Sequence, residues 1–386
     1  MTNTDMKIVD MVTCDFLGRF RVMHLLGDSS GDGCFVDASS IHLGAHIYDS
    51  DIKLMPAASR QFLLNGVLKD VNICNMSRAC PRTLLTNLVN QLADEGYEVK
   101  IGIEPEFFLL NKDGTPTDSK QYMFHVELNG FEHELIRTMF AAGLEPTRFH
   151  HEVAPGQYEF GFKYADPVTA GDNLIIFKLI VHQLAAKYGF KASFHPKPFP
   201  ELSGSGMHVH SSIWKNGVNL FSNEPNLSSL GGDTNISDLA KSYVEGLLTY
   251  SKDFTLLFAS EDEAYVRLGG NEAPKNICVG CSNRSALVRI PAHSKAEATT
   301  VEFRAPNPHN NPYLVFSAMI SAGMLGIRQN LKMREPITTS AYAVDGIETL
   351  PQSLDEALDI ARSSSFLKSV LGDIHPQLIS VFTKRH

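Results

Sequence analysis

The sequence predicts an α+β protein, with a β-rich segment at the N-terminus and a longer mixed segment after it. Three observations support this class. Residues 5–75 contain short strand-like runs broken by turns, an amphipathic helix opens at Cys80-Pro81-Arg82, and strands alternate with helices in the remainder. Proline near the first helical position is typical of a helix start. We therefore place a domain boundary near Ser77, which divides the chain into residues 1–77 and 78–386.

The N-terminal segment shows the alternation and turn signals of a small sheet. Residues 7–12 and 19–23 are rich in β-branched and apolar side chains, which favours strands. Residues 27–33 contain three glycines among serines and aspartates, so we expect a flexible loop there.

Apolar spacing predicts the main helices of the second segment. In the helix after Cys80, the residues expected on one face are Leu84, Leu85, Leu88, Val89 and Leu92. A second helix is expected to start at Gly171-Asp172, with Leu174, Ile175, Phe177, Leu179, Ile180 and Leu184 buried. Asn311-Pro312 should cap a helix that is apolar nearly all round and hence central. Residues 353–371 form the last predicted helical region.

Composition excludes several classes of protein. With 43% hydrophobic residues among 386, the chain can bury a sizeable core. Its net charge of −9 argues against an extended nucleic-acid interface. Residues 313–327, the longest apolar stretch, are too short to span a bilayer, and Met1–Asp10 lack the features of a secretory signal. We expect a cytoplasmic protein without nucleic-acid or membrane partners.

The six cysteines show no zinc-type pairing. Cys278-Val279-Gly280-Cys281 has the C-x-x-C spacing, but no second pair accompanies it. A redox motif is the alternative interpretation, and reduced thiols of a cytosolic protein are the preferred one.

Polar residues placed two apart on strand-like segments are the strongest functional signal. Glu104 and Glu106 flank Pro105, His208 and His210 flank Val209, and Glu302 lies two residues before Arg304. Residues i and i+2 of a strand point to one face, so each pair projects to the same side. Carboxylates aimed at one space repel each other unless a cation lies between them, and oxygen ligands with an imidazole suit Mg²⁺ or Mn²⁺. This pattern predicts a divalent-metal site across a sheet. The alternative for each residue alone is a solvated glutamate or a core histidine.

Nine sequence blocks, in order along the chain, resemble those of the glutamine synthetase family. The blocks cover residues 37–41, 103–108, 151–159, 194–198, 204–210, 271–274, 283–291, 301–304 and 310–314. The resemblance implies a small N-terminal β-grasp domain followed by an α/β catalytic domain with a curved antiparallel sheet. It also implies a homo-oligomeric ring, a hexamer or dodecamer, with active sites between neighbouring subunits.

The resemblance assigns the metal ligands to two sets. Glu106, Glu152 and Glu159 would hold one Mg²⁺ or Mn²⁺. Glu104, His208 and Glu302 would hold the second, near the phosphates of ATP. Two cations would draw the phosphates together and neutralise charge as the phosphoryl group moves.

The resemblance also implies roles for residues around these ligands. Arg267 would meet the α-carboxylate of glutamate, with Gly204 beside it, and Arg284, Arg289 and Arg304 would line the phosphate and glutamate side of the cleft. His210, Ser212 and Arg289 would contact the nucleotide.

Glu272 would lie on a flap over the glutamate site. Asp37 would reach the neighbouring subunit's site and help deprotonate an ammonium ion. Surface ion pairs for the arginines, a glycine-rich turn for Glu272 and a turn residue for Asp37 are the alternatives.

The chain departs from the family pattern at several positions. Thr300 replaces a basic residue, Ser203 replaces an asparagine, and the flap sequence is Gly-Gly-Asn-Glu. Tyr122 is a candidate for the tyrosine of the ammonium pocket. The helical tail and the extra N-terminal helix typical of the family are not expected in this sequence. These departures concern the amine acceptor, the acid substrate and the stacking of rings, and leave the metal ligands in place.

The resemblance implies an ATP-dependent ligase that joins the γ-carboxylate of glutamate to ammonia through γ-glutamyl phosphate. A ligase for small alkylamines or polyamines is an almost equal alternative. A non-catalytic regulatory member of the family is a third hypothesis, which the presence of all six metal-ligand candidates disfavours.

Overall fold

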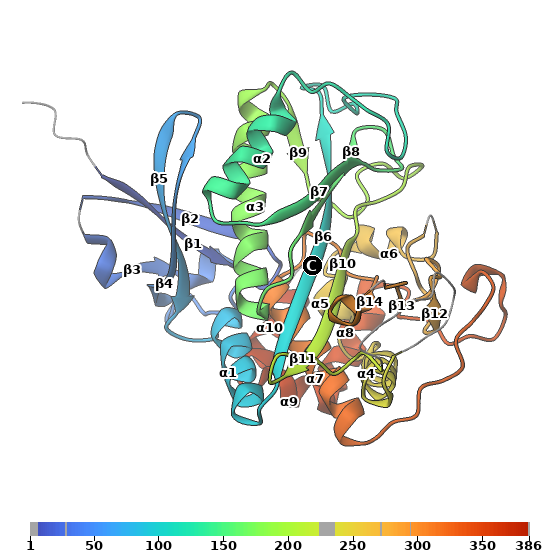
Figure 1. Cartoon of the computed structure of the whole chain (residues 1–386). Coiled ribbons are helices and arrows are strands. Elements are labelled where there is room, and N and C mark those ends of the chain that lie inside the picture. The colour runs from blue at the N-terminus through green and yellow to red at the C-terminus, as the bar shows by residue number, and fades with distance from the viewer. Residues whose placement is uncertain (1–6, 28, 224–235, 271, 294, 385–386) are drawn as a thin grey trace, which may run out of the picture.

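The computed structural model describes residues 7–27, 29–223, 236–270, 272–293 and 295–384. Its N-terminal part is a five-stranded sheet in the order β2-β1-β5-β4-β3 (Figure 1). The strands are β1 (Ile8–Cys14), β2 (Phe20–Leu26), β3 (Cys34–Asp37), β4 (Asp51–Leu64) and β5 (Val67–Met76). β1 and β5 pair in parallel and the other pairs are antiparallel. The β-grasp assignment itself stays a prediction.

A nine-stranded sheet forms the centre of the larger part. Its main path is β12-β13-β14-β10-β6-β8-β7, with β11 paired to β10 and β9 paired to β6. The strands are β6 (Glu98–Leu110), β7 (Pro146–His151), β8 (Gln157–Phe162), β9 (Lys191–Ser193), β10 (Met207–Lys215), β11 (Val218–Asn219), β12 (Val279–Cys281), β13 (Val288–Ile290) and β14 (Val301–Phe303). The expected antiparallel sheet is therefore correct except at β12 and β13, which pair in parallel.

Helices pack around this sheet, mainly behind and below it in Figure 1. They are α1 (Pro81–Asp94), α2 (Phe131–Ala141), α3 (Pro167–Lys187), α4 (Asp238–Tyr250), α5 (Thr255–Phe258), α6 (Asp262–Arg267), α7 (Pro312–Arg328), α8 (Leu354–Ser363), α9 (Ser365–Leu371) and α10 (Ile374–Thr383). α3 packs on β6 and β9, while α7 packs on α1 and α4. As predicted, Asn311 caps α7, whose first turns are buried on all sides.

One sequence-based helix start was wrong, and one predicted helical region consists of two helices. α3 begins at Pro167, because the Asp166 carboxylate accepts hydrogen bonds from the backbone N–H groups of Val168 and Thr169, both at 3.1 Å. The buried face predicted for this helix is correct. The predicted region 353–371 is two helices, α8 and α9, because Ser364 interrupts it and caps α9. α10 was not predicted.

The small sheet and the larger part meet at a buried junction. The Lys178 side chain is fully buried on α3, and its ammonium donates to the carbonyl oxygens of Gly18 (3.1 Å) and Pro308 (2.8 Å). Asn311 donates to the carbonyl oxygen of Asp15 at 2.8 Å. Gly18 has a φ of 82°, and a Cβ there would lie 1.8 Å from the carbonyl oxygen of His309, so this turn requires glycine. The boundary near Ser77 falls between β5 and α1 and stays a prediction.

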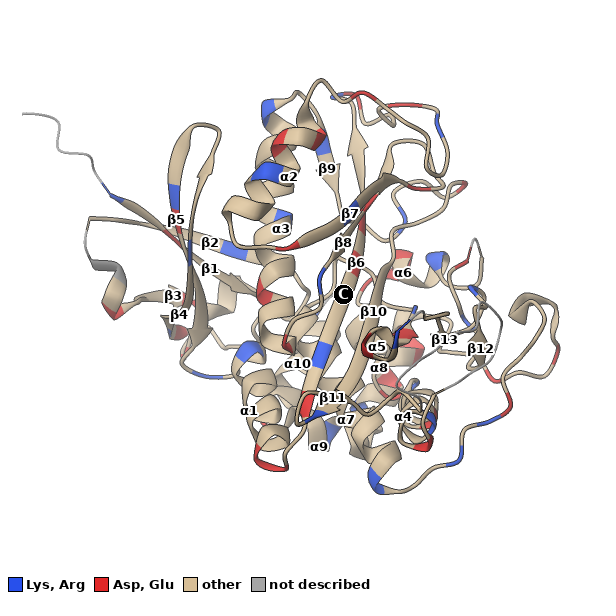
Figure 2. Cartoon of the chain, in the orientation of Figure 1, with Lys and Arg blue, Asp and Glu red and all other residues tan. Residues whose placement is uncertain are grey.

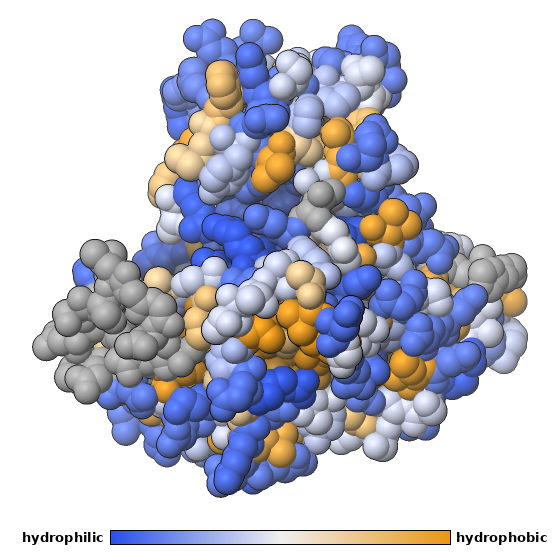
Figure 3. All heavy atoms as spheres, turned by 90° about the vertical axis from the view of Figure 1, so that its right-hand side faces the viewer, coloured by the Kyte–Doolittle hydropathy of each residue, from blue (hydrophilic) through white to orange (hydrophobic). Residues whose placement is uncertain are grey.

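The surface carries both signs of charge. Acidic and basic residues are spread over the small sheet and the larger part (Figure 2). Figure 3, which turns the right-hand side of Figure 1 to the viewer, shows mainly hydrophilic residues, with hydrophobic ones gathered below the middle. All six cysteines are free thiols. Among the residues described, none of the helices combines the length and the apolar character that crossing a bilayer requires.

Candidate active site

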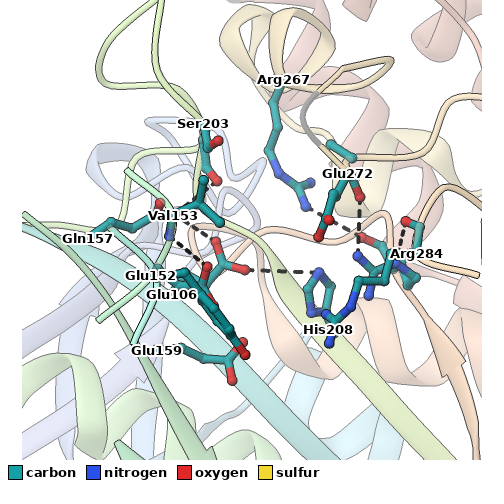
Figure 4. A pocket seen from close by; sticks show the side chains of 14 residues that line it. Glu106, Glu152, Val153, Gln157, Glu159, Ser203, His208, Arg267, Glu272 and Arg284 are labelled. Carbon is teal, nitrogen blue, oxygen red and sulfur yellow. Dashed lines mark hydrogen bonds and ion pairs between the residues drawn. The ribbon is translucent and has the colours of Figure 1, made fainter. Parts of the chain in front are cut away.

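Three glutamates meet at one wall of a cavity of about 220 Å³ (Figure 4). Glu106 on β6 lies directly opposite Glu159 on β8 in the antiparallel ladder. Glu152 follows β7, and a turn at Ala154–Gln157 returns the chain to β8. All three glutamates predicted for the first metal therefore line one cavity. The ligand atoms of Glu152 and Glu159 lie within 4.8 Å of each other and of His150, which was not predicted. Gln157 and the backbone N–H of Gly206 donate to one Glu106 oxygen, at 2.8 and 2.9 Å, which fixes that carboxylate.

The ionisation of these glutamates indicates a site that needs a cation. Burial raises the pKa of Glu106 well above its usual range, and the charges of Glu152 and Glu159 raise it further. Burial, followed by the charge of Glu159, raises the pKa of Glu152 to about 7. A divalent cation held by the three carboxylates would remove this repulsion, and an all-oxygen donor set fits Mg²⁺ or Mn²⁺.

The second predicted set, Glu104, His208 and Glu302, lies beside the first, because Glu104 is two residues before Glu106 on β6. His208 on β10 pairs with Glu104 on β6, and its Nδ1 lies 3.7 Å from a Glu104 oxygen and 3.6 Å from a Glu302 oxygen. His210 pairs with Glu302 on β14. Glu104 and Glu106 share one face of β6, and residues two apart on a strand are separated by about 6.6 Å, enough for two neighbouring cation positions.

Arginines surround Glu302, which is fully buried. Arg289 and Arg304 donate to its two oxygens at 2.7 and 2.6 Å. Burial alone would raise the pKa of Glu302, but Arg304, His210, His208 and Arg289 outweigh it and lower the value to about 2. Glu302 is therefore ionised at neutral pH and fits a cation ligand. Arg289 does not line the 220 Å³ cavity that Arg284 and Arg304 line.

His210 and Ser212 open onto a second cavity, of about 300 Å³, on the other side of Glu104. The Nε2 atom of His210 lies 2.9 Å from a Glu104 oxygen. Although burial opposes it, His210 and His208 hold the pKa of Glu104 well below its usual range. The predicted nucleotide-binding histidine and serine are thus neighbours of the second set, and Thr300 lies in the same cavity wall.

The predicted glutamate-side residues line the first cavity. Arg267, the last residue of α6, is buried and donates to the carbonyl oxygen of Ala305 at 2.6 Å. Gly204, Arg284 and Glu272 complete this side, together with Ser203 and Tyr122. In Figure 4, Arg267, Glu272 and Arg284 lie opposite the three glutamates. Arg304 holds this wall together by donating to the carbonyl oxygens of Glu272 (3.2 Å) and Arg284 (3.1 Å).

Two predicted features lie partly or wholly outside this arrangement. Asn271 of the predicted flap falls outside the described residues, whereas Glu272 is described, with a φ of 65°. Asp37 does not line either cavity of its own chain. Its carboxylate accepts hydrogen bonds from the Ser39 and Ser40 hydroxyls, both at 2.6 Å, which lower its pKa to about 2. Its reach into a neighbouring subunit stays a prediction.

Sequence reasoning missed two basic residues of the site. Arg148 on β7 contacts Glu104 and lies 3.3 Å from Glu159, and His150, also on β7, lies 3.3 Å from Glu159. The signal was present, since Arg148, His150 and Glu152 alternate towards one side.

Comparison with known proteins agrees with this geometry. Residues 78–384 match the family model described as the glutamine synthetase catalytic domain. The chain is 36% identical to a glutamine synthetase of Methanococcus maripaludis, over 88% of this chain and 81% of the relative. It is 34% identical to that of Methanocaldococcus jannaschii, over 88% and 80%.

Solved structures share the fold. GmaS in complex with ADP aligns with a TM-score of 0.85 at 26% identity, covering 96% of this chain and 91% of GmaS. Plasmodium falciparum glutamine synthetase aligns with a TM-score of 0.83 at 21% identity, covering 98% and 92%. The fold and the site define an ATP-dependent ligase of nitrogen metabolism. The chain belongs to the glutamine synthetase family.

Proposed function

We propose that this protein joins the γ-carboxylate of glutamate to ammonia or a small amine, with ATP converted to ADP and phosphate. The clustering of carboxylates and imidazoles at one place on the large sheet is the observation that carries the proposal. The ligand atoms of Glu104, Glu159 and His208 lie within 4.8 Å of one another, and so do those of Glu104, His210 and Glu302. The relatives named glutamine synthetase support the acid substrate, and the ADP complex of GmaS supports the binding of a nucleotide.

The proposed reaction has two steps, phosphoryl transfer and amide formation, and the residues that line each cavity suggest where the substrates bind. Glutamate binds in the first cavity with its α-carboxylate at Arg267 and its γ-carboxylate towards the metal-ligand candidates. ATP binds in the second cavity beside His210 and Ser212. The γ-carboxylate oxygen attacks the terminal phosphorus, ADP leaves, and γ-glutamyl phosphate forms. The amine nitrogen then attacks the acyl carbon and phosphate departs.

The chain's own residues would each serve one of these steps. Glu106, Glu152 and Glu159 would hold one cation and Glu104, His208 and Glu302 the other, and the cations would supply charge neutralisation at the phosphates. Arg284 and Arg304 would stabilise the charge on the transferred group. Glu272 would cover the acyl phosphate and exclude water. Asp37 would act on the amine from a neighbouring subunit in a ring.

A ligase for small amines remains the second candidate. Ser203 lines the first cavity next to Gly204, at a position where the family pattern has an asparagine, and this departure supports a pocket that admits an amine larger than ammonium. The two candidates share the phosphorylation step and differ only in the nucleophile.

The deciding experiment measures ADP release with glutamate, Mg²⁺ and a panel of ammonium, methylamine, ethanolamine and putrescine, followed by the product mass. One amine should give a product of the mass of its γ-glutamyl amide. Removal of divalent cations with a chelator should abolish turnover, and Zn²⁺ should not restore it. Full activity in excess chelator, or no glutamate-dependent ADP with any amine, would contradict the proposal.

A further inference from the structure

One guanidinium joins the two sets of metal-ligand candidates. Arg148 on β7 places its Nε atom 3.3 Å from Glu159 of the first set, and its Nη2 atom contacts Glu104 of the second. The side chain thus occupies the space between the two sets, as a positive charge that belongs to the chain itself.

The sheet provides a path for this side chain. Arg148 lies opposite Gly161 on β8, next to an irregularity in the pairing between Pro146 and Arg148. A Cβ at position 161 would lie 2.6 Å from Cγ and 3.0 Å from Nε of Arg148. Glycine therefore gives Arg148 the room to lie across β8, and a pairing irregularity of this kind re-aims a side chain.

Arg148 also reaches the second cavity. Its side chain is 48% exposed and lines this cavity together with His210, Ser212 and Thr300. Lys100 is the other long basic side chain in the wall of this cavity. Its Nζ atom lies 3.6 Å from the ring centroid of Trp214 and 5.2 Å from that of Tyr164. Arg148 contacts Glu104, which lines the same cavity.

We propose that Arg148 is a phosphate-binding residue that exchanges partners during the reaction cycle. Without cations it neutralises Glu104 and Glu159. When divalent cations take these carboxylates, the guanidinium is released and turns to the nucleotide phosphates in the second cavity. This inference rests on the proposed function, since it requires nucleotide and cations at these positions.

Two physical arguments support the exchange. A guanidinium and a divalent cation repel each other, so a cation bound at Glu104 and Glu159 would weaken the attraction of these carboxylates for Arg148, whose half-exposed side chain is free to move away. The planar donor fork of arginine fits phosphate oxygens in pairs, and a half-exposed side chain can turn without unpacking the core.

The test compares two binding measurements that should move in opposite directions. In Arg148→Ala, the affinity for ADP in the presence of Mg²⁺ should fall about tenfold, the value of one charge-assisted contact. The affinity for Mn²⁺ without nucleotide should rise, because the competing charge is gone. General loss of structure would weaken both. Arg137→Ala, on an exposed position of α2, is the matched control and should change neither.

A second variant displaces the side chain without removing its charge. Gly161→Ala should weaken ADP binding when Arg148 is present and should have no further effect in Arg148→Ala. Unchanged ADP affinity in Arg148→Ala, or weaker Mn²⁺ binding, would overturn the inference while leaving the proposed function intact. A wild-type protein that binds neither ADP nor Mn²⁺ would overturn both.

Discussion

Glu302 is the residue on which the proposed chemistry depends most. It is fully buried, lies beside His208, and is held by Arg289 and Arg304. Glu302→Gln keeps its volume but removes the charge, so kcat for amide formation should fall at least tenfold, a loss of ~1.4 kcal/mol or more. Steady-state ADP release measures this, with circular dichroism as the check on folding. A variant above a tenth of wild-type kcat contradicts the assignment.

The raised pKa of Glu152 predicts a pH dependence of cation binding. Its carboxyl holds a proton up to about pH 7 in the folded, cation-free protein, whereas the unfolded chain releases it near the ordinary value of 4.5. The cation-free protein should therefore lose stability as the pH rises from about 4.5 to 7. A cation must displace this proton, so Mn²⁺ should bind about tenfold more tightly at pH 8 than at pH 6.

Titration calorimetry at the two pH values measures this effect. Glu152→Gln serves as the internal comparison, since it removes the titrating group and should flatten the profile. Equal Mn²⁺ affinity of the wild type at pH 6 and pH 8 would show that Glu152 is already ionised.

At the scale of elements, the start of α3 provides a stability test away from the site. One Asp166 oxygen accepts hydrogen bonds from two backbone N–H groups of the first turn. Asp166→Ala should lower the free energy of unfolding by about 1 kcal/mol, while Asp166→Asn should retain most of it. Urea unfolding measures the difference, and KM for ATP should stay unchanged. A loss equal in the two variants would argue against the cap.

The elements also show how far sequence reasoning reaches. Alternation along β6, β10 and β14 correctly placed Glu104 with Glu106, His208 with His210 and Glu302 with Arg304, because strand periodicity is local. The start of α3 was misplaced because Asp166 and Pro167 precede the apolar run that marks the helix. Arg148 shares the strand alternation that leads to Glu152, but its contact with Glu104 was missed, because that contact depends on the room at Gly161 of the paired strand and not on a local pattern. The roles of Asp37, Arg267 and Glu272 came from the resemblance and stay predictions.

For the whole molecule, the proposed sharing of sites between subunits predicts complementation. Asp37 lies on the small sheet and lines neither cavity of its own chain, whereas Glu302 lies on β14 of the nine-stranded sheet. Inactive Asp37→Ala and Glu302→Gln chains, unfolded and refolded together, should regain activity, because some mixed sites receive both intact halves. Each variant refolded alone is the control. A fully active monomer by light scattering would contradict the ring.

The buried junction between the two sheets bears on how this protein can be dissected. A fragment that starts at residue 78 would lack Gly18. Of the two carbonyl oxygens that accept hydrogen bonds from the Lys178 ammonium, it would keep only that of Pro308. The cut would also expose apolar surface to water, because the buried residues of the small sheet belong to the same hydrophobic core as those of the larger part. The fragment matched by the catalytic-domain family model should therefore be insoluble or molten when expressed alone, and calorimetry of the intact chain should show one melting transition.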